Sequence, residues 1–194
     1  VSIVYNTPGT TRDYNSAEFN IGAVTCLLFD TAGIESHSSP DLNDKTSSKT
    51  KSLLSIADII LFITDAKNGM TGNDIEFANY LRKFKTKIFL LSNKMETKAA
   101  EEGYWDFFTL GIGDPIPISA SHGLGITDLL ESIQEHLASI TSNSTVIQHR
   151  VQKSATKIEK FDQKFFPEGD QSFSMIERNE IIKLAIIGRP NVGK

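Results

Sequence analysis

The sequence contains very little cysteine, no excess of positive charge and no long hydrophobic run. Its single cysteine, Cys26, cannot form a disulfide within the chain, and this composition suits a reducing cytoplasm. The formal net charge of -4 gives no overall attraction to DNA or to an anionic membrane. The apolar runs are far shorter than the ~20 residues that span a bilayer. We therefore expect a cytoplasmic protein with neither DNA nor a membrane as its partner.

Histidine is also scarce. The four histidines have neither the spacing of metal ligands nor the partners of a nucleophilic Ser–His–acid set. A hydrophobic content of 39% and a charged content of 23% are instead those of an ordinary globular core with a polar surface. A chain of 194 residues can hold one domain and part of another.

Short apolar runs alternate with longer amphipathic stretches, which is typical of an α/β fold. The runs 58–64 and 87–92 are continuously apolar at their centres, as parallel strands covered on both faces are. Two earlier runs are separated only by Gly22, which predicts an antiparallel pair at one edge of the sheet. The expected strands are Ser16–Ile21, Ala23–Phe29, Asp58–Thr64, Lys87–Ser92 and Pro115–Ile118.

Three helices are expected between these strands. Thr71 and Asp74 have the spacing of a helix start, and Ile75, Ala78 and Leu81 then recur on one face. A second helix is predicted from Thr97 to Leu110, ending at Gly111, and a third from Thr127 or Asp128. The residues expected to pack in the second helix are Trp105, Phe107, Phe108 and Leu110, and those in the third are Leu129, Leu130, Ile133 and Leu137. The polar segment 35–52 is interpreted as a mobile loop that leads into a helix.

The composition changes near residue 140. The stretch "TSNST" has the composition of a linker, and the residues that follow are charged and weakly periodic up to Asn179. From Glu180 the pattern of a buried strand returns, over Ile181–Ile187. This predicts three parts, at residues 1–139, 140–180 and 181–194.

The chain closes on "GRPNVGK", directly after that last strand. Its Gly-x-x-x-x-Gly-Lys spacing allows backbone N–H groups to surround phosphate oxygens, while the lysine adds a positive charge at the outer phosphates. This predicts a phosphate-binding loop made of Gly188, Arg189, Pro190, Asn191, Val192, Gly193 and Lys194. The Ser or Thr that usually follows the lysine and binds Mg²⁺ would come after the last residue.

Further polar motifs stand at the ends of the expected strands. Asp30, Thr31, Ala32 and Gly33 form "DTAG", in which the carboxylate could hold Mg²⁺ through water and Gly33 could approach a γ-phosphate. Asn93, Lys94, Met95 and Glu96 are similar to a guanine-reading motif, and Ser119 and Ala120 to the loop behind the base. Thr11, within "TPGTTRD", offers a hydroxyl to the metal. Each motif alone is weak evidence for a nucleotide site. Ligands of such sheets bind at the carboxyl ends of the strands, so the presence of these motifs in this order, each at a strand end, is strong joint evidence.

Together these motifs resemble the Era-like branch of the translation-factor GTPases. Within it, the closest resemblance is to the bacterial ribosome-assembly group with two GTPase domains in one chain. The stretches that carry it are "NTPGTTRD", "LLFDTAGIE", "ADIILFITDAKNGMT", "LGIGDPIPISASHGLGITDLL" and "IKLAIIGRPNVGK". The resemblance implies a P-loop NTPase-type, mostly parallel sheet with helices on both faces. It also implies GTP and GDP as ligands, Mg²⁺ as cofactor, GTP hydrolysis, and the large ribosomal subunit and its rRNA as partners.

The resemblance also gives the three parts an interpretation. Residues 1–139 match a first GTPase domain without its opening strand, phosphate loop and first helix. Residues 140–180 match the interdomain linker, and residues 181–194 match the first strand and phosphate loop of a second domain. On this basis we expect the sequence to be an internal piece of a longer protein.

Two positions depart from related patterns. Glu96 stands where the family has Asp, and its extra methylene shifts a carboxylate that accepts two hydrogen bonds from guanine. Ile34 stands where Ras-like enzymes carry a water-orienting glutamine. For Era-like enzymes the resemblance implies hydrolysis aided by K⁺, held partly by the phosphate-loop asparagine, which is Asn191 in this sequence.

Three other interpretations remain. A tRNA-modification GTPase of the same branch is disfavoured by the linker and the loop that follows it. A nucleotide-idle scaffold that binds RNA or protein is compatible with Glu96. A circularly permuted GTPase would need its first helix and its metal-binding Ser or Thr after Lys194.

The strand at Ile181–Ile187 has a predicted place in the sheet. In the family, the strand that feeds the phosphate loop lies between the counterparts of 23–29 and 58–64. We expect Ile181–Ile187 to fill that position, parallel to both neighbours, and to bring the loop beside Asp30 and Gly33. Unless this loop substitutes for the first domain's own, we expect the 194-residue chain to bind GTP poorly.

The departure at Glu96 gives a first testable prediction. In a longer chain that includes the first domain's own phosphate loop, Glu96→Asp should tighten guanine nucleotides and leave adenine nucleotides unchanged. A good bidentate contact to a base is worth about 1–3 kcal/mol, so titration calorimetry with GDP and ADP would resolve the difference. An unchanged GDP affinity would mean that Glu96 already reaches the base.

Overall fold

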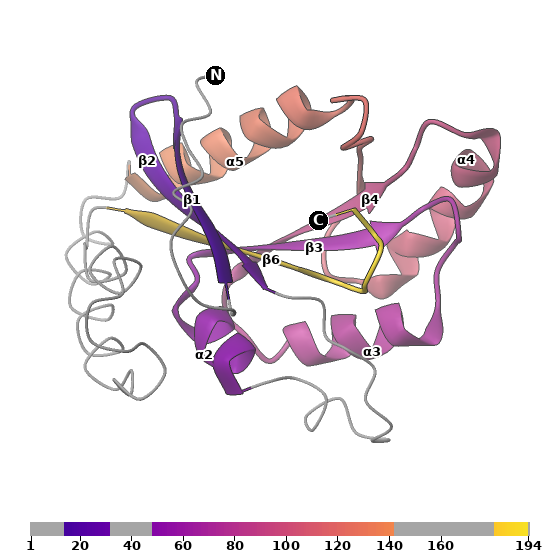
Figure 1. Cartoon of the computed structure of the whole chain (residues 1–194), viewed down its shortest axis with the longest axis horizontal. Coiled ribbons are helices and arrows are strands. Elements are labelled where there is room, and N and C mark those ends of the chain that lie inside the picture. Colours follow the sequence, from indigo (N-terminus) through magenta and orange to yellow (C-terminus); the bar gives the residue numbers. More distant parts are fainter. Residues whose placement is uncertain (1–13, 32–47, 142–180, 194) are drawn as a thin grey trace.

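Six strands form one mixed sheet in the computed structural model, which describes residues 14–31, 48–141 and 181–193. The strand order is β1-β2-β6-β3-β4-β5 (Figure 1). The strands are β1 (Tyr14–Ile21), β2 (Val24–Thr31), β3 (Ile59–Asp65), β4 (Lys87–Asn93), β5 (Ile116–Pro117) and β6 (Ile182–Gly188). Only β1 is antiparallel to its neighbour. The predicted α/β class and mostly parallel sheet are confirmed.

The hairpin of β1 and β2 lies at one edge of the sheet, as the single glycine between the two apolar runs predicted. Ile21 pairs with Val24, and Gly22 takes a φ of +60°, which glycine adopts at little cost. Cys26 in β2 is fully buried, and this burial raises the pKa of its thiol to about 11. A thiol of that kind stays protonated, so Cys26 is a small core residue.

Strand β6 occupies the centre of the sheet, between β2 and β3. Its register aligns Ile186 with Asp30 of β2 and with Leu61 of β3, and both pairings are parallel. Figure 1 shows this strand, in yellow, between strands from the first half of the described chain. The expectation that Ile181–Ile187 fills this position is confirmed.

The start of β6 is held by Asp58, the residue before β3. Its backbone N–H donates to the carbonyl of Lys183 at 2.8 Å, and its Oδ2 accepts the backbone N–H of Lys183 at 3.0 Å. The Lys183 side chain is buried, and this burial lowers the pKa of its ammonium. The two strands are therefore locked in register at the end opposite the phosphate loop.

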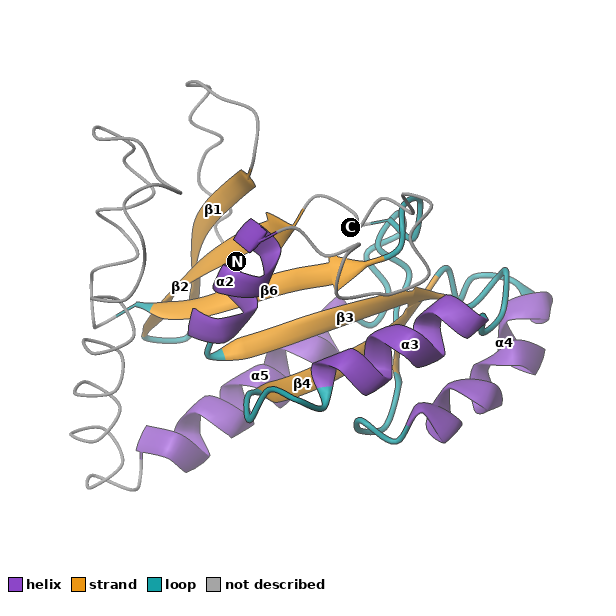
Figure 2. Cartoon of the chain, turned by 90° about the horizontal axis from the view of Figure 1, so that it is seen from below, coloured by secondary structure: helices purple, strands orange, loops and turns teal. Residues whose placement is uncertain are grey.

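Helices cover both faces of the sheet. They are α2 (Ser48–Ile56), α3 (Gly72–Leu81), α4 (Lys98–Tyr104), the 3-10 helix η1 (Trp105–Leu110) and α5 (Ile126–Thr141). Helices α2, α3, α4 and η1 share one core with the sheet, whereas α5 packs on the opposite face (Figure 2). No helix within the described residues is long and apolar enough to cross a membrane.

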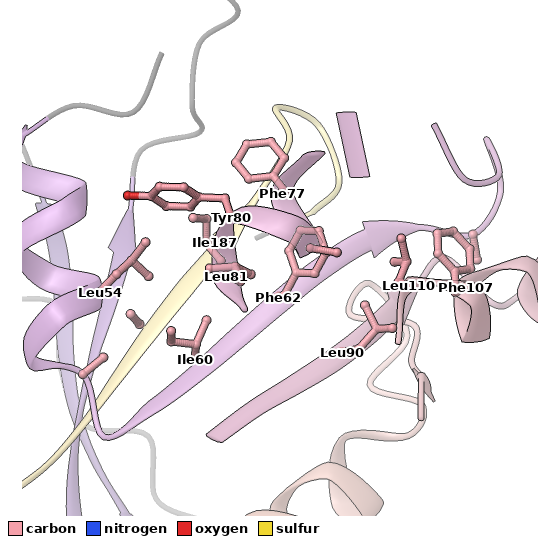
Figure 3. Close-up of a cluster of buried hydrophobic side chains, with 14 of the residues drawn as sticks. Leu54, Ile60, Phe62, Phe77, Tyr80, Leu81, Leu90, Phe107, Leu110 and Ile187 are labelled. Carbon is pink, nitrogen blue, oxygen red and sulfur yellow. The ribbon is translucent and has the colours of Figure 1, made fainter. Parts of the chain in front are cut away.

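Alternate residues of β6 contribute to the two cores. Ala185 and Ile187 join the core under α2 and α3, which Figure 3 shows with Leu54, Phe62 and Phe77. Leu184 points to the other face, where it meets the α5 residues. Among the predicted α5 packing residues, Leu129, Ile133 and Leu137 are buried and Leu130 is half-buried. The central strand thus belongs to both halves of the hydrophobic core.

The segment predicted as one helix from Thr97 to Leu110 changes its winding at Trp105, where α4 becomes the 3-10 helix η1. Three residues per turn place Phe107 and Leu110 on one side and Trp105 and Phe108 on another. The first pair is buried, as predicted. The prediction that Trp105 and Phe108 pack in the core is wrong: they are 69% and 40% exposed, and their rings stack on each other.

Helix α3 begins as predicted, but one residue of its predicted apolar face is exposed. Thr71 is the N-cap and forms a capping box with Asp74. The buried face contains Asp74, Phe77, Ala78 and Leu81, and this leaves Ile75 44% exposed. The helix therefore turns a carboxylate inward in place of an isoleucine.

The central position of β6 predicts how much stability it supplies. Leu184 is fully buried in β6, so Leu184→Ala should lower the free energy of unfolding by about 2–5 kcal/mol, measured by urea denaturation. Leu124→Ala is the matched control, because Leu124 is 56% exposed and should cost little. An equally small loss of unfolding free energy in both variants would contradict the central position of β6.

Candidate functional site

The side chain of Asn93, at the end of β4, joins the phosphate loop to the loop at Ser119. Its Nδ2 donates to the carbonyl of Val192 at 2.7 Å. Its Oδ1 accepts the backbone N–H of Ala120 at 2.9 Å. Asn93 is buried, so both ends of the amide must be satisfied within the protein. Two predicted motifs, 93–96 and 119–120, therefore meet the loop in one place.

Lys94 makes a second contact with the same loop. Its ammonium donates to the carbonyl of Asn191 at 2.7 Å and to Asp65 Oδ2 at 2.7 Å. Asp65, at the end of β3, also accepts the backbone N–H and the side-chain amide of Asn68. Burial alone would raise the pKa of Asp65, but hydrogen bonds from Lys94 and Asn68 and the lysine charge lower it. The carboxylate is therefore ionised and orients the lysine.

The two glycines of the loop stand where a side chain cannot fit. A Cβ on Gly188 would lie 2.5 Å from the carbonyl oxygen of Ile63. A Cβ on Gly193 would lie 2.6 Å from Asn93 Nδ2, and Gly193 also has a φ of +83°. Asn191 has a positive φ of 63°, which asparagine tolerates better than most residues. The Gly-x-x-x-x-Gly spacing thus permits the loop to lie against β3 and β4.

On its other side, the loop contacts helix α3. Arg189 Nε donates to Asp74 Oδ1 at 2.9 Å, across 115 positions of sequence. Pro190 follows Arg189 at the exposed tip of the loop. Neither Asp65 nor Asp74 was predicted to contact the loop. Only the capping-box spacing of Asp74 was visible in the sequence.

At the predicted base-reading end, Glu96 is exposed just after the end of β4. The pKa of Glu96 is lowered, first by a hydrogen bond from the Ser119 side chain and further by the charges of His122 and Lys67. Ser119 is buried, and its hydroxyl lies 2.9 Å from His122 Nδ1. The Glu96 carboxylate is therefore favoured in its ionised form at the predicted base-reading end.

At the end of β2, Asp30 aligns with Ile186, two residues before the loop begins. The buried hydroxyl of Thr31 donates to the Ile186 carbonyl at 2.6 Å, so β2 is tied to the strand that carries the loop. The other predicted contributors, Thr11, Ala32, Gly33, Ile34 and Lys194, lie outside the described residues.

The resemblance implies Mg²⁺ and K⁺ at this site. Within residues 14–31, 48–141 and 181–193 no group of three or more His, Cys, Asp or Glu could hold a metal ion. A nucleotide-bound Mg²⁺ needs only one or two protein ligands beside phosphates and waters, and Asp30 at the strand end fits that requirement. Asn191 exposes its side chain at the loop, as a K⁺ ligand would need.

Comparison with known proteins finds GTPases that are similar to this chain. A family model described as "50S ribosome-binding GTPase" matches residues 1–94. Proteins named GTPase Der are similar over the entire chain: 32% identity for Rhizobium etli, 38% for Caldanaerobacter subterraneus and 36% for Clostridium perfringens. The predicted resemblance to GTPases of the Der type is confirmed. The chain spans 37–40% of the length of these three relatives.

The ionised Asp65 predicts how stability depends on pH. Because its folded-state pKa is lowered, its stabilising contribution is present above the unfolded pKa of about 3.9 and is lost as the pH falls through the folded value. Asp65→Asn should therefore lower the urea midpoint at pH 7, and the difference from wild type should shrink below about pH 4. The exposed control Asp114→Asn should run parallel to wild type. A constant Asp65→Asn difference from pH 7 to pH 3 would argue against the Lys94–Asp65 pair.

Proposed function

Because the chain is similar over its whole length to GTPase Der of several bacteria, we propose that it belongs to a protein that binds GTP and GDP and hydrolyses GTP. The observation that carries this proposal is the double contact of Asn93 and Lys94 with the carbonyls of Val192 and Asn191. These contacts orient the loop between the base-reading end and the end of β2. A nucleotide extends from its base to its phosphates. Its site therefore needs the base-reading residues and the phosphate loop in fixed positions relative to each other.

The proposed site assigns each group a role. The backbone N–H groups of 188–189 and 191–194 and the Lys194 ammonium bind the phosphates, while Asn93, Glu96 and the Ser119–Ala120 loop bind the base. Asp30, with Thr11, would hold Mg²⁺, and Asn191 would contribute to a K⁺ site. When bound, Mg²⁺ neutralises charge on the phosphate oxygens. Thr31, Ala32, Gly33 and Ile34 complete the segment facing the γ-phosphate.

We further propose that the GTP state controls binding to the large ribosomal subunit and its rRNA in the cytoplasm. The matched description, a 50S ribosome-binding GTPase, and the Der relatives support this role. The same relatives support an organisation in which 1–139 belongs to a first GTPase domain, 140–180 to a linker and 181–194 to the start of a second. The contacts described within residues 14–31, 48–141 and 181–193 concern the proposed nucleotide site and give no information on RNA binding.

One observation favours a nucleotide-idle scaffold as the second candidate. Glu96 has one methylene more than the family's Asp, which displaces the carboxylate that would accept two hydrogen bonds from guanine. A scaffold of this kind would keep the fold and the loop contacts without using them for nucleotide binding.

Titration of the 194-residue chain with fluorescent GDP, with and without Mg²⁺, separates the two candidates. We expect saturable binding, and Lys94→Ala should weaken it about 10- to 100-fold, because a hydrogen bond from a charged group is worth about 1.5–3 kcal/mol. The matched control is Lys98→Ala, at an exposed lysine on α4. A folded chain that binds neither guanine nor adenine nucleotides would support the idle scaffold.

A further inference from the structure

Asp74 binds two different parts of the structure with its two carboxylate oxygens. Oδ2 accepts the backbone N–H of Thr71 at 2.9 Å and its hydroxyl at 2.7 Å, which completes the capping box of α3. Oδ1 accepts Arg189 Nε at 2.9 Å. The carboxylate is fully buried, so both oxygens act without competing water.

Capping of α3 accounts for only one of these oxygens. A capping box stabilises a helix start when its acidic residue lies at the surface, so it does not require a buried carboxylate. In α3 the carboxylate is turned inward and Ile75 is left 44% exposed. Burying a charge is costly unless it is paired, and Arg189 provides the pairing. The inward orientation of Asp74 is therefore explained by the phosphate loop rather than by the helix.

The buried position of the Arg189 guanidinium in turn depends on Asp74. It follows Gly188, whose backbone packs closely against the carbonyl of Ile63. Its guanidinium is largely buried, and Nη2 has no hydrogen-bond acceptor among the described residues. The Nε contact to Asp74 is the one ion pair of Arg189 within residues 14–31, 48–141 and 181–193. Without Asp74, a buried cation would lose its partner, and the start of the loop would move to reach water.

The loop is thus held from two sides. Residues 191–192 are bound through their carbonyls by Lys94 and Asn93 at the end of β4. Arg189 is bound from α3, on the opposite side of the loop. A loop whose backbone N–H groups bind phosphates loses affinity when it must be ordered by the ligand, so both attachments favour binding.

We propose that Asp74 is a positioning residue for the phosphate loop and acts through Arg189. Its effect on nucleotide affinity rests on the proposed function, whereas its effect on the order of residues 188–193 does not.

The test compares Asp74→Asn with Thr71→Val by hydrogen–deuterium exchange of the 194-residue chain without nucleotide. Asp74→Asn keeps an acceptor for Thr71 but removes the charge that binds Arg189. We expect exchange of the loop amides 188, 189 and 191–193 to accelerate at least tenfold in this variant. Thr71→Val, which removes a capping hydroxyl and leaves the ion pair, should accelerate only the first turn of α3. Accelerated exchange in α3 alone for both variants would overturn the proposal and leave Asp74 a capping residue.

A second variant addresses the same contact from the loop. Arg189→Gln should accelerate the same loop amides, and the double variant with Asp74→Asn should lose no more protection than the worse single variant. Additive losses would show that the two residues act independently and would contradict the proposal. In the GDP titration, each single variant should bind about tenfold more weakly. If wild type binds no GDP while the loop exchange responds as described, the proposed function fails and the positioning role stands.

Discussion

The structure depends on the pairing of β6 with two parallel neighbours. The backbone groups of a central strand need partners on both sides, and β2 pairs with Ile182–Ile186 while β3 pairs with Leu184–Gly188. The same strand places Leu184 in one core and Ala185 and Ile187 in the other. Both hydrophobic layers and the position of the loop therefore follow from where this one segment lies.

The candidate site forms because the carboxyl ends of β3, β4 and β6 meet at one edge of the sheet. Polar side chains gather there and bind groups from other strand ends, loops and helix α3. Asn93 joins two loops, Lys94 joins Asp65 to Asn191, and Asp74 joins α3 to Arg189. Because the buried amide and carboxylates have few alternative partners, these contacts hold the loop in a single place.

Hydrophobic patterning predicted much of the fold. The continuous runs in β3 and β4, the glycine turn between β1 and β2, and the capping box at Thr71 all form as expected. Two predictions were wrong where local geometry changed. The 3-10 winding of η1 exposes Trp105 and Phe108, and the inward carboxylate of Asp74 displaces Ile75. Neither change is visible in the spacing of apolar residues, because both depend on contacts with other elements.

The sequence by itself determined the kinds of strand and helix and the glycine spacing of the loop. These are local properties, set by side-chain periodicity and by the space that Gly188 and Gly193 leave for the backbone. Tertiary structure decided which carboxylates serve the loop: Asp65 and Asp74 meet their partners across 29 and 115 positions of sequence. Such pairings depend on which strand ends lie next to one another in the fold, and the pattern of residues along the chain does not specify this.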